Sequence, residues 1–437
     1  MAVRHLDSLE PEAIRVERDP ARLRRTAVLV ASKSGATAES MVMEAVLRSA
    51  APDPDGLQRR LLAVSDPGSP LFERATAEGW RAVLPGHPDV GGRFSALGPY
   101  GAAPAVLGGR DMASVLKPAR ALSERLRRGA AEGAGDPGFD LGGLLVALAR
   151  AGRTRALITA SPAWSSILPW VEQMLAESTG KDGRGILPVL LRGGDPPARV
   201  SERDFLIHFG DAGEEDTAAA RAHAAGAPAI CSTAGAAGAT GEIFRWQVAI
   251  AAAAMGLGVN PFDQPDVEGA KREARQFMER PPDHRVGVRE SDAAGFFRAA
   301  RTGGLAVNAF GHRNSFAERA FARLQQDLAG RLGSPPAIGF GSALLHSLGQ
   351  LEKGGPPGLA VLILSWGPPP EGDIPIPPSP ALPEAVAGLG TAAFVRLQAM
   401  ADARELARRG RQVLRLDEPA SGNRGLDALL ARLRRLL

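Results

Sequence analysis

Short apolar runs alternate with longer, helix-length segments in the first part of the chain. The run TAVLVA, residues 26–31, is continuous and of strand length, as buried parallel strands are. It leads into the polar segment SKSGATAES and then into a predicted helix through Met41 and Val46. Strand-like runs recur at LLAVS, from Leu61, and at RAVLPG, from Arg81. This alternation predicts a doubly wound parallel sheet.

The same alternation continues after a Gly/Pro/Asp-rich segment, EGAGDPGFDLGG, which we take as a linker. We expect a second copy of the first architecture in this part of the chain. Its predicted elements are a helix over 144–152, strands at TRALITAS, ILPVLL, DFLIHFG and PAIC, and further helices that include 214–225. We also expect a strand at 3–8 and a helix over 11–24. The last third adds strand-like runs, an extended Pro-rich surface arm and an amphipathic end.

The predicted fold class is therefore α/β, with two doubly wound, flavodoxin-like parallel-sheet units followed by a C-terminal α/β segment. The predicted boundaries are 1–135 for the first unit, 136–290 for the second, and 291–437 for the C-terminal segment, which carries the Pro-rich arm. A chain of 437 residues suits two or three such units.

Composition narrows the class of protein. The 44% hydrophobic and 23% charged residues are typical of a soluble globular protein, and no apolar run is long enough to span a membrane. Acidic residues stand where a signal peptide needs an apolar core, so we expect a cytoplasmic location. The single cysteine, Cys231, excludes an internal disulfide and a thiolate metal cluster. The 52 basic and 48 acidic residues nearly cancel and aromatic residues are few, so we expect no nucleic-acid partner.

The segment LPWVEQMLAESTGKDGRGILPV carries the first candidate chemistry. Pro169 can open a helix, and Gln173 and Glu177 then share a face because they are four residues apart. Glu177 ends this helix, where the macrodipole and partial burial both raise the pKa of a carboxyl group. A raised pKa suits a general base for carbon acids. The alternative is a solvated glutamate before an ordinary glycine-rich loop.

Two further loops could contact an anionic ligand. Ser32, Lys33, Ser34 and Thr37 lie where a strand passes through a glycine-containing loop into a helix N-terminus, which is a phosphate-binding arrangement. Arg93 lies in the glycine-rich loop DVGGRFSALG, which also leads into a helix. The alternative for Arg93 is a tight turn with a solvated side chain.

Two polar clusters remain later in the chain. Gln264 and Lys271 are seven residues apart, so they point to one side of a predicted helix that Pro265 opens; the alternative is a capped helix with a surface lysine. His346, in ALLHSLGQLEKGGP, is the best-placed histidine for acid–base work, although a lone histidine is more often structural. We expect no metal and no cofactor, because no histidines and carboxylates have ligand spacing.

Several of these motifs together resemble one family. AESTGK followed by GRGILPV resembles the catalytic segment of phosphoglucose isomerases, which are built from sugar isomerase (SIS) domains. HSLGQLEKGGP and GRQVLRLD resemble the isomerase half of bacterial transaldolase/glucose-6-phosphate isomerase fusions. The resemblance implies a cofactor-free glycolytic homodimer that interconverts glucose 6-phosphate and fructose 6-phosphate.

The resemblance also implies a role for each candidate residue. Glu177 is then the base that moves a proton between C1 and C2, and Gln173 lies beside it. SKSGAT binds the sugar phosphate through Ser32, Lys33, Ser34 and Thr37, and GGRFS places Arg93 against the negative charge of the enediolate. FDQPDVEGAK brings Gln264 and Lys271 into the site. Lys271 or His346 could open the sugar ring, a role that no motif of this chain assigns.

The chain departs from the family pattern in four places. Ala36 replaces a hydroxyl residue, Asp266 replaces a glycine, no Asn-Gly-Gln-His sequence occurs, and the first strand with its Gly-Gly-Ser turn has no counterpart. Two hypotheses follow: an active glucose-6-phosphate isomerase, or a sugar-phosphate-binding module without turnover. Mannose 6-phosphate stays open as another substrate.

Overall fold

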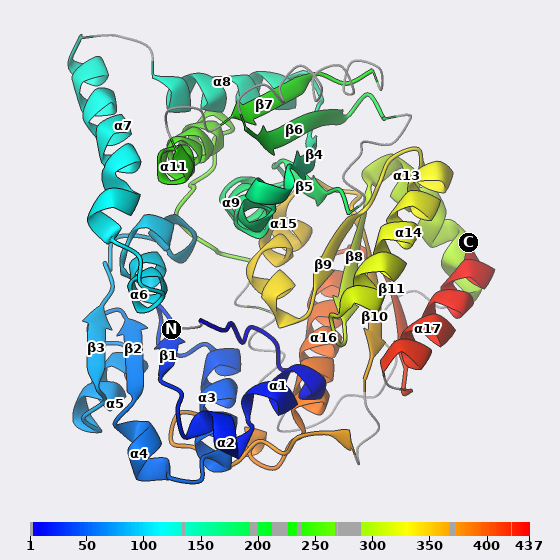
Figure 1. The fold of residues 1–437 in the computed structure, drawn as a ribbon. Coiled ribbons are helices and arrows are strands. Elements are labelled where there is room, and N and C mark those ends of the chain that lie inside the picture. Colours follow the sequence, from blue (N-terminus) through cyan, green and yellow to red (C-terminus); the bar gives the residue numbers. More distant parts are fainter. Residues whose placement is uncertain are drawn as a thin grey trace.

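A computed structural model describes residues 3–132, 136–192, 200–211, 226–233, 238–266, 269, 290–367, 372–420 and 422–437. The predicted helix over 214–225 and the position of Lys271 lie outside these ranges. Within them, the strands form three sheets in which every strand pair is parallel (Figure 1). The predicted α/β class with parallel sheets is confirmed.

The first sheet has the strand order β1-β2-β3, namely β1 (Val28–Ala31), β2 (Leu61–Ser65) and β3 (Ala82–Pro85). Its helices are α1 (Pro11–Glu17), α2 (Pro20–Leu23), α3 (Ala38–Ala50), α4 (Pro54–Gln58), α5 (Pro70–Ala77), the 3-10 helix η1 (Gly92–Leu97), α6 (Pro99–Leu107) and α7 (Met112–Glu132). The strand predicted at 3–8 is wrong. The helix predicted over 11–24 is two helices, because the Asp19 side chain caps a new helix that starts at Pro20.

The second sheet has the order β5-β4-β6-β7, with β4 (Arg155–Ala160), β5 (Leu187–Leu190), β6 (Asp204–Gly210) and β7 (Ala229–Thr233). Its helices are α8 (Pro137–Arg150), η2 (Pro162–Ile167), α9 (Leu168–Thr179) and α11 (Gly238–Gly256). The linker predicted over 132–143 is wrong in its second half. Helix α8 begins there, because Asp136 caps the N–H groups of Gly138 and Phe139 and Pro137 fits the first turn.

The third sheet has the order β11-β10-β8-β9, with β8 (Leu305–Phe310), β9 (Ala337–Phe340), β10 (Ala360–Trp366) and β11 (Gln412–Glu418). Its helices are η4 (Glu290–Asp292), α13 (Ala293–Gly303), α14 (Ser315–Leu332), η5 (Ser342–His346), α15 (Leu348–Gly354), η7 (Glu384–Val386), α16 (Thr391–Arg408) and α17 (Gly422–Leu436). In both the second and third sheets, the first strand lies between the second and the third. The repeated strand order therefore joins these two sheets, whereas we expected it to join the first and second.

Helices cover both faces of the third sheet. Val307 and Leu362 face one way, into a core with α13, α14 and α17. Val361 and Ile363 face the other way, into a core with α16 and with Ile14 and Val42 of the first unit. The first unit therefore packs directly on the third sheet. The Pro-rich arm, which we expected on the surface, also enters this core, because Ile374 and Ile376 are 3% and 1% exposed.

The second and third sheets meet at their edge strands β5 and β9. Arg192 Nη2 donates to the Ile338 carbonyl at 2.7 Å, and Gln325 Nε2 donates to the Leu190 carbonyl at 2.9 Å. Leu348 and Leu351 of α15 pack in one core with Ala176 of α9. Helices α9 and α15 therefore lie side by side near the middle of the molecule (Figure 1).

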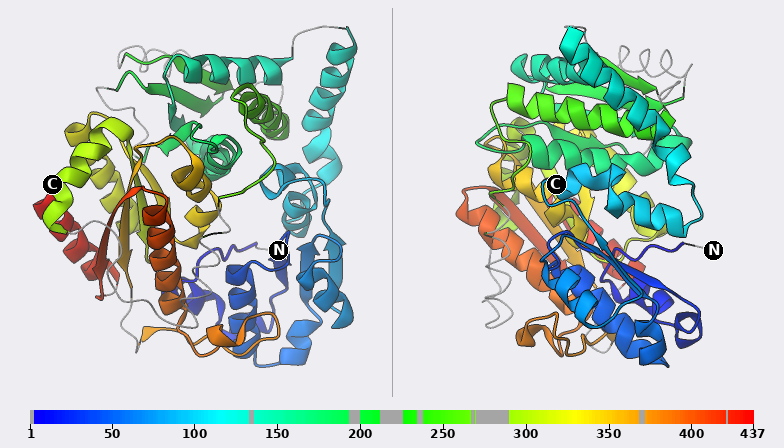
Figure 2. Two further views of the ribbon diagram at one scale, coloured as in Figure 1. Left: turned by 180° about the vertical axis from the view of Figure 1, so that it is seen from behind. Right: turned by 90° about the vertical axis from the view of Figure 1, so that its left-hand side faces the viewer.

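Helix α7 runs along one side of the molecule, from the first unit to the layer of α8 and α11 (Figure 2). Over the part of the chain that the structure describes, no helix is both long and apolar enough to cross a membrane.

Glu172 of α9 provides a test of what it costs to bury an ionised carboxylate in this helix. It is 8% exposed, its Oε1 has no hydrogen-bond partner among the described residues, and burial raises its pKa from 4.5 to about 7. The folded state therefore binds this proton more tightly than the unfolded chain. This tighter proton binding adds about 3 kcal/mol to the free energy of unfolding below pH 4.5. The added stability is lost as the pH rises to about 7.

We expect Glu172→Gln to raise the melting temperature relative to wild type, and to do so more at pH 8 than at pH 4.5. The amide carries no charge at either pH, so the variant avoids the cost of an ionised, buried carboxylate. Thermal unfolding of both proteins at the two pH values measures the effect. A difference that is equal at both values would contradict the prediction.

Candidate active site

Glu177 lies in the last turn of α9, and its side chain is almost completely buried. Pro169 occupies the first turn, as predicted, and Val171, Met174 and Leu175 pack into the core of the second unit. The whole residue is 1% exposed. The predicted alternative of a solvated, helix-end glutamate is therefore wrong.

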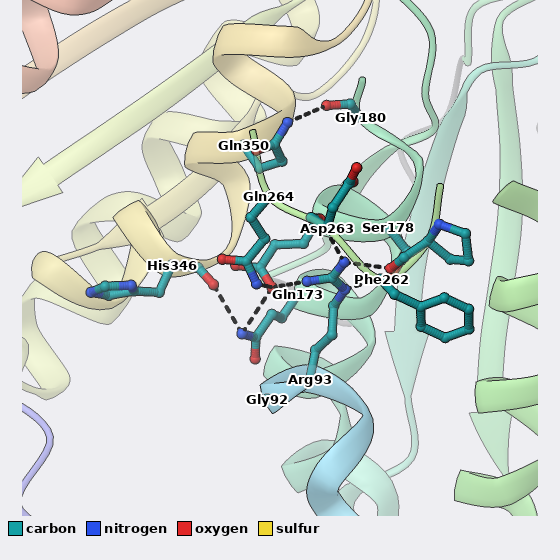
Figure 3. A network of polar contacts seen from close by, with 12 residues as sticks. Gly92, Arg93, Gln173, Ser178, Gly180, Phe262, Asp263, Gln264, His346 and Gln350 are labelled. Atoms are coloured by element: carbon teal, nitrogen blue, oxygen red, sulfur yellow. Dashed lines mark hydrogen bonds and ion pairs between the residues drawn. The ribbon is translucent and has the colours of Figure 1, made fainter. Parts of the chain in front are cut away.

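Three side chains, all labelled in Figure 3, donate to one oxygen of the Glu177 carboxylate. Arg93 Nη1 and Gln173 Nε2 each lie 3.3 Å from Oε2, and Gln264 Nε2 lies 3.4 Å from it. Burial raises the pKa of Glu177 to about 7, even though the charges of Arg93 and His346 and these hydrogen bonds act in the opposite direction. Glu177 can therefore take up or release a proton near neutral pH.

Arg93 is as deeply buried as Glu177. It lies on η1 and is 2% exposed, so a solvated arginine in a tight turn is wrong. Its Nε donates to Ser178 Oγ at 2.9 Å, and its Nη2 donates to the carbonyls of Pro261 and of Asp263, the latter at 3.0 Å. The guanidinium thus connects the first unit, the end of α9 and the segment that carries Gln264.

Lys181 holds the same segment from the other side. Its ammonium contacts the Asn260 carbonyl and lies 2.7 Å from both the carbonyl and Oδ1 of Asp263. The residue is 2% exposed. We did not predict Lys181 as a site residue; its only sequence signal was its place in STGK, four residues after Glu177.

His346 lies between α9 and the first unit. Its backbone carbonyl accepts from Gln173 Nε2 at 3.0 Å, and its Nε2 lies 3.6 Å from Oε1 of Glu39 in the first turn of α3. In Figure 3 the carbonyl faces Gln173, whereas the imidazole points away from Arg93. The His346 side chain is 44% exposed. No pattern along the chain singles out Glu39, because an acidic residue in a first helical turn is common.

The predicted phosphate loop connects β1 to α3. Gly35 has a φ of +64° there, and a Cβ on it would lie 2.6 Å from the Leu71 nitrogen, so the turn requires glycine. Ser32 Oγ donates to Thr37 Oγ1 at 2.9 Å, and Ser34 Oγ accepts from the Ala36 N–H at 3.3 Å. Thr37 is the N-cap of α3, so its hydroxyl and the first N–H groups of the helix lie at one end of it.

Lys33 makes contacts inside the first unit. Its ammonium pairs with Asp66 and donates to the carbonyls of His87 and Pro88, each at 3.2 Å. It thereby connects the phosphate loop to the segment just before Arg93.

The structure thus brings Glu177, Gln173, Arg93 and Gln264 together, and it places His346 beside Gln173. Lys271 lies outside the described residues. Within the described ranges, no group of three or more His, Cys, Asp and Glu side chains is arranged to hold a metal ion.

The fold and the site together define a class of protein, namely α/β proteins built from parallel-sheet units. In this chain a buried carboxylate with a pKa near neutral lies beside a buried arginine, and the first unit carries a phosphate-type loop. No protein-family model matches the chain. A solved structure, that of a hypothetical protein of Thermus thermophilus, is similar with 25% identity and a TM-score of 0.51, over 63% of this chain and 77% of that one.

Several curated relatives share one functional name, and two of them show the extent of the match. The chain is 33% identical to the glucose-6-phosphate isomerase of Rubrobacter xylanophilus over 186 residues, which are 42% of this chain and 40% of that protein. It is 34% identical to the probable glucose-6-phosphate isomerase of Haloarcula marismortui over 214 residues, 47% and 48% of the two chains. The matches therefore span less than half the length of these relatives. They confirm the resemblance to glucose-6-phosphate isomerases, whereas the closer resemblance to transaldolase fusions stays a prediction.

Arg93→Lys tests how the site sets the protonation of Glu177. A lysine ammonium cannot reach Glu177, Ser178 and the two backbone carbonyls at once, so the carboxylate loses part of its positive surroundings. We expect the pKa of Glu177 to rise above about 7. Carbon-13 NMR titration of glutamate-labelled protein measures it, with Glu177→Gln to assign the resonance. An unchanged or lower pKa would contradict the electrostatic role of Arg93.

Proposed function

We propose that this protein is an aldose–ketose isomerase that interconverts glucose 6-phosphate and fructose 6-phosphate through an enediolate. One observation carries the proposal: Glu177 is 1% exposed, has a pKa near 7, and contacts the side chains of Arg93, Gln173 and Gln264. The similarity to proteins named glucose-6-phosphate isomerase supports it over two-fifths to a half of the chain.

The reaction needs no external oxidant, because one proton moves from C2 to C1 and a second moves from the oxygen on C2 to the oxygen on C1. Glu177 as carboxylate takes the proton from C2 of the open-chain aldose, which leaves an enediolate, and returns a proton to C1. Arg93 then lies beside the base, where its positive charge stabilises the developing oxyanion. The loop with Ser32, Ser34 and Thr37 would anchor the phosphate group at the start of α3.

Ring opening requires a second proton carrier. His346 with Glu39 is the histidine–carboxylate pair that the structure offers beside Gln173. The pKa of Glu39 lies below its ordinary value: burial opposes this shift, but the contacts from His346 and Gln398 outweigh burial. A carboxylate that stays charged would orient the imidazole. Lys271 is the other candidate from the sequence.

The second candidate function is a sugar-phosphate-binding module without turnover. It is favoured by Lys33, whose ammonium already pairs with Asp66, and by the imidazole of His346, which points away from Arg93 (Figure 3). The same proposal includes four further points. They are a homodimer, a cytoplasmic location, glucose rather than mannose phosphate as the substrate, and unit boundaries at residues 135 and 290.

Glu177→Gln is expected to lower kcat by about 10²- to 10⁴-fold, because positioned proton transfer supplies about that much rate. A coupled assay from fructose 6-phosphate to glucose 6-phosphate measures it without added metal. Glu172→Gln is the matched control, since Glu172 is a buried glutamate of the same helix with no contact to the Glu177 carboxylate among the hydrogen bonds of the described residues. Similar losses in the two variants would reject Glu177 as the base. Folded wild type that binds the sugar phosphate without turnover would reject the isomerase.

The pH dependence of kcat/KM gives an independent check. Glu177 acts as a base only when deprotonated, so kcat/KM is expected to rise with pH and to level off above about pH 7. Below that value it should fall about tenfold per pH unit. Steady-state rates from about pH 5.5 to about pH 8.5 measure the profile. A profile that stays flat over this range would show that Glu177 is not the titrating base.

A further inference from the structure

Gln350 joins the two segments that bring Glu177 and Gln264 together. It lies on α15 and is completely buried. Its Nε2 donates to the Gly180 carbonyl at 3.0 Å and to Asp266 Oδ2 at 2.6 Å, and its Oε1 accepts from the Asp266 N–H at 3.1 Å (Figure 3 shows the bond to Gly180). A flipped amide would turn its oxygen toward two other oxygens, so only one orientation satisfies all three contacts.

Asp266 extends this connection to α16. Its Oδ1 pairs with Arg409 Nη1, and Arg409 Nε donates to Oε1 of Glu405 at 2.6 Å. Glu405 is 1% exposed and lies in the last turns of α16. A continuous polar chain therefore runs from α16 through Arg409, Asp266 and Gln350 to the end of α9.

Close packing leaves α15 little room to move against this chain. A Cβ on Gly180 would lie 2.4 Å from the Leu351 Cβ, and a Cβ on Gly354 would lie 2.1 Å from Asp266 Oδ2. The Gly183 N–H also donates to the Gly354 carbonyl at 2.9 Å. The middle of α15 thus contacts the loop after Glu177, and its C-terminal end contacts both that loop and Asp266, two places after Gln264.

We propose that Gln350, Asp266 and Arg409 are positioning residues that hold the Gln264 amide against the Glu177 carboxylate. The Gln264 contact is 3.4 Å long, at the far limit of a hydrogen bond, so a small backbone shift at Asp266 breaks it. The proposal rests on the isomerase function, because the geometry of Glu177 and Gln264 matters for proton transfer. It also accounts for an acidic residue near an anionic substrate: Arg409 and Gln350 already pair with the Asp266 carboxylate.

Arg409→Gln, Asp266→Asn and the double variant test the proposal. Arg409 is 30% exposed, so its replacement leaves the buried core intact. Arg408→Gln is the matched control: Arg408 also pairs with Glu405, at 3.3 Å, but its side chain is 61% exposed, and the ion pair with Asp266 belongs to Arg409. Gln350→Leu tests the buried end of this series of polar contacts. Circular dichroism and the melting temperature of the variant show whether it folds.

We expect kcat of Arg409→Gln and Asp266→Asn to fall about tenfold or more, because a displacement of about 1 Å can cost up to 10²-fold. KM is expected to stay within about twofold, since the phosphate loop is untouched. The acidic limb of the kcat/KM profile should move to higher pH, because Glu177 loses a donor to its charged form. The double variant should lose no more than the worse single variant, because both changes break one connection.

Hydrogen exchange separates this proposal from the isomerase function. In Arg409→Gln and Gln350→Leu, the peptide over 258–266 is expected to exchange at least about tenfold faster than in wild type and in Arg408→Gln. That result holds whether or not the wild type turns over fructose 6-phosphate. Unchanged exchange, an Arg408→Gln variant as impaired as Arg409→Gln, or a fall in kcat without a shift of the acidic limb would each overturn the positioning role.

Discussion

Glu177 and Arg93 bring opposite charges into a volume from which water is excluded, and much of the site depends on this pair. Their side chains are 2% and 0% exposed, and their closest polar atoms are 3.3 Å apart. Each charge alone would cost several kcal/mol to bury, so each residue offsets the cost of burying the other only while both are present. Because one residue comes from the first unit and the other from the second, the pair couples the site to the docking of the two units.

The surroundings of this pair divide the tasks of the proposed proton-transfer site between separate parts of the fold. Helix α9 supplies the carboxylate, η1 supplies the cation, and the segment 260–266 supplies an amide. That segment is held by side chains rather than by regular structure: Arg93 and Lys181 bind its carbonyls, and Gln350 binds Asp266. Directed contacts of this kind can fix a loop with the accuracy that proton transfer requires.

Burial is also what raises the pKa of Glu177 to near neutrality. The same physical cause acts on Glu172 and Glu352, whose pKa values also rise to about 7 and which do not touch the Glu177 carboxylate. A raised pKa therefore does not by itself identify a base in this protein. What distinguishes Glu177 is that cationic and amide donors from different units converge on one of its oxygens.

Patterns along the chain were enough to predict most of the elements and the two central charges of the site. Continuous apolar runs predicted strands such as β2 and β6, and Pro169 with Glu177 predicted the two ends of α9, because these signals depend on neighbours along the chain. The same patterns misplaced the repeat, because strand order depends on contacts between distant segments. They also misplaced the linker, because the neighbouring glycines obscured the local signal of the Asp136 cap. Tertiary packing alone paired Lys33 with Asp66, brought Glu39 to His346, and placed Gln350 between Gly180 and Asp266. These partners lie tens to hundreds of residues apart, and no spacing rule along a chain can specify a contact that packing creates.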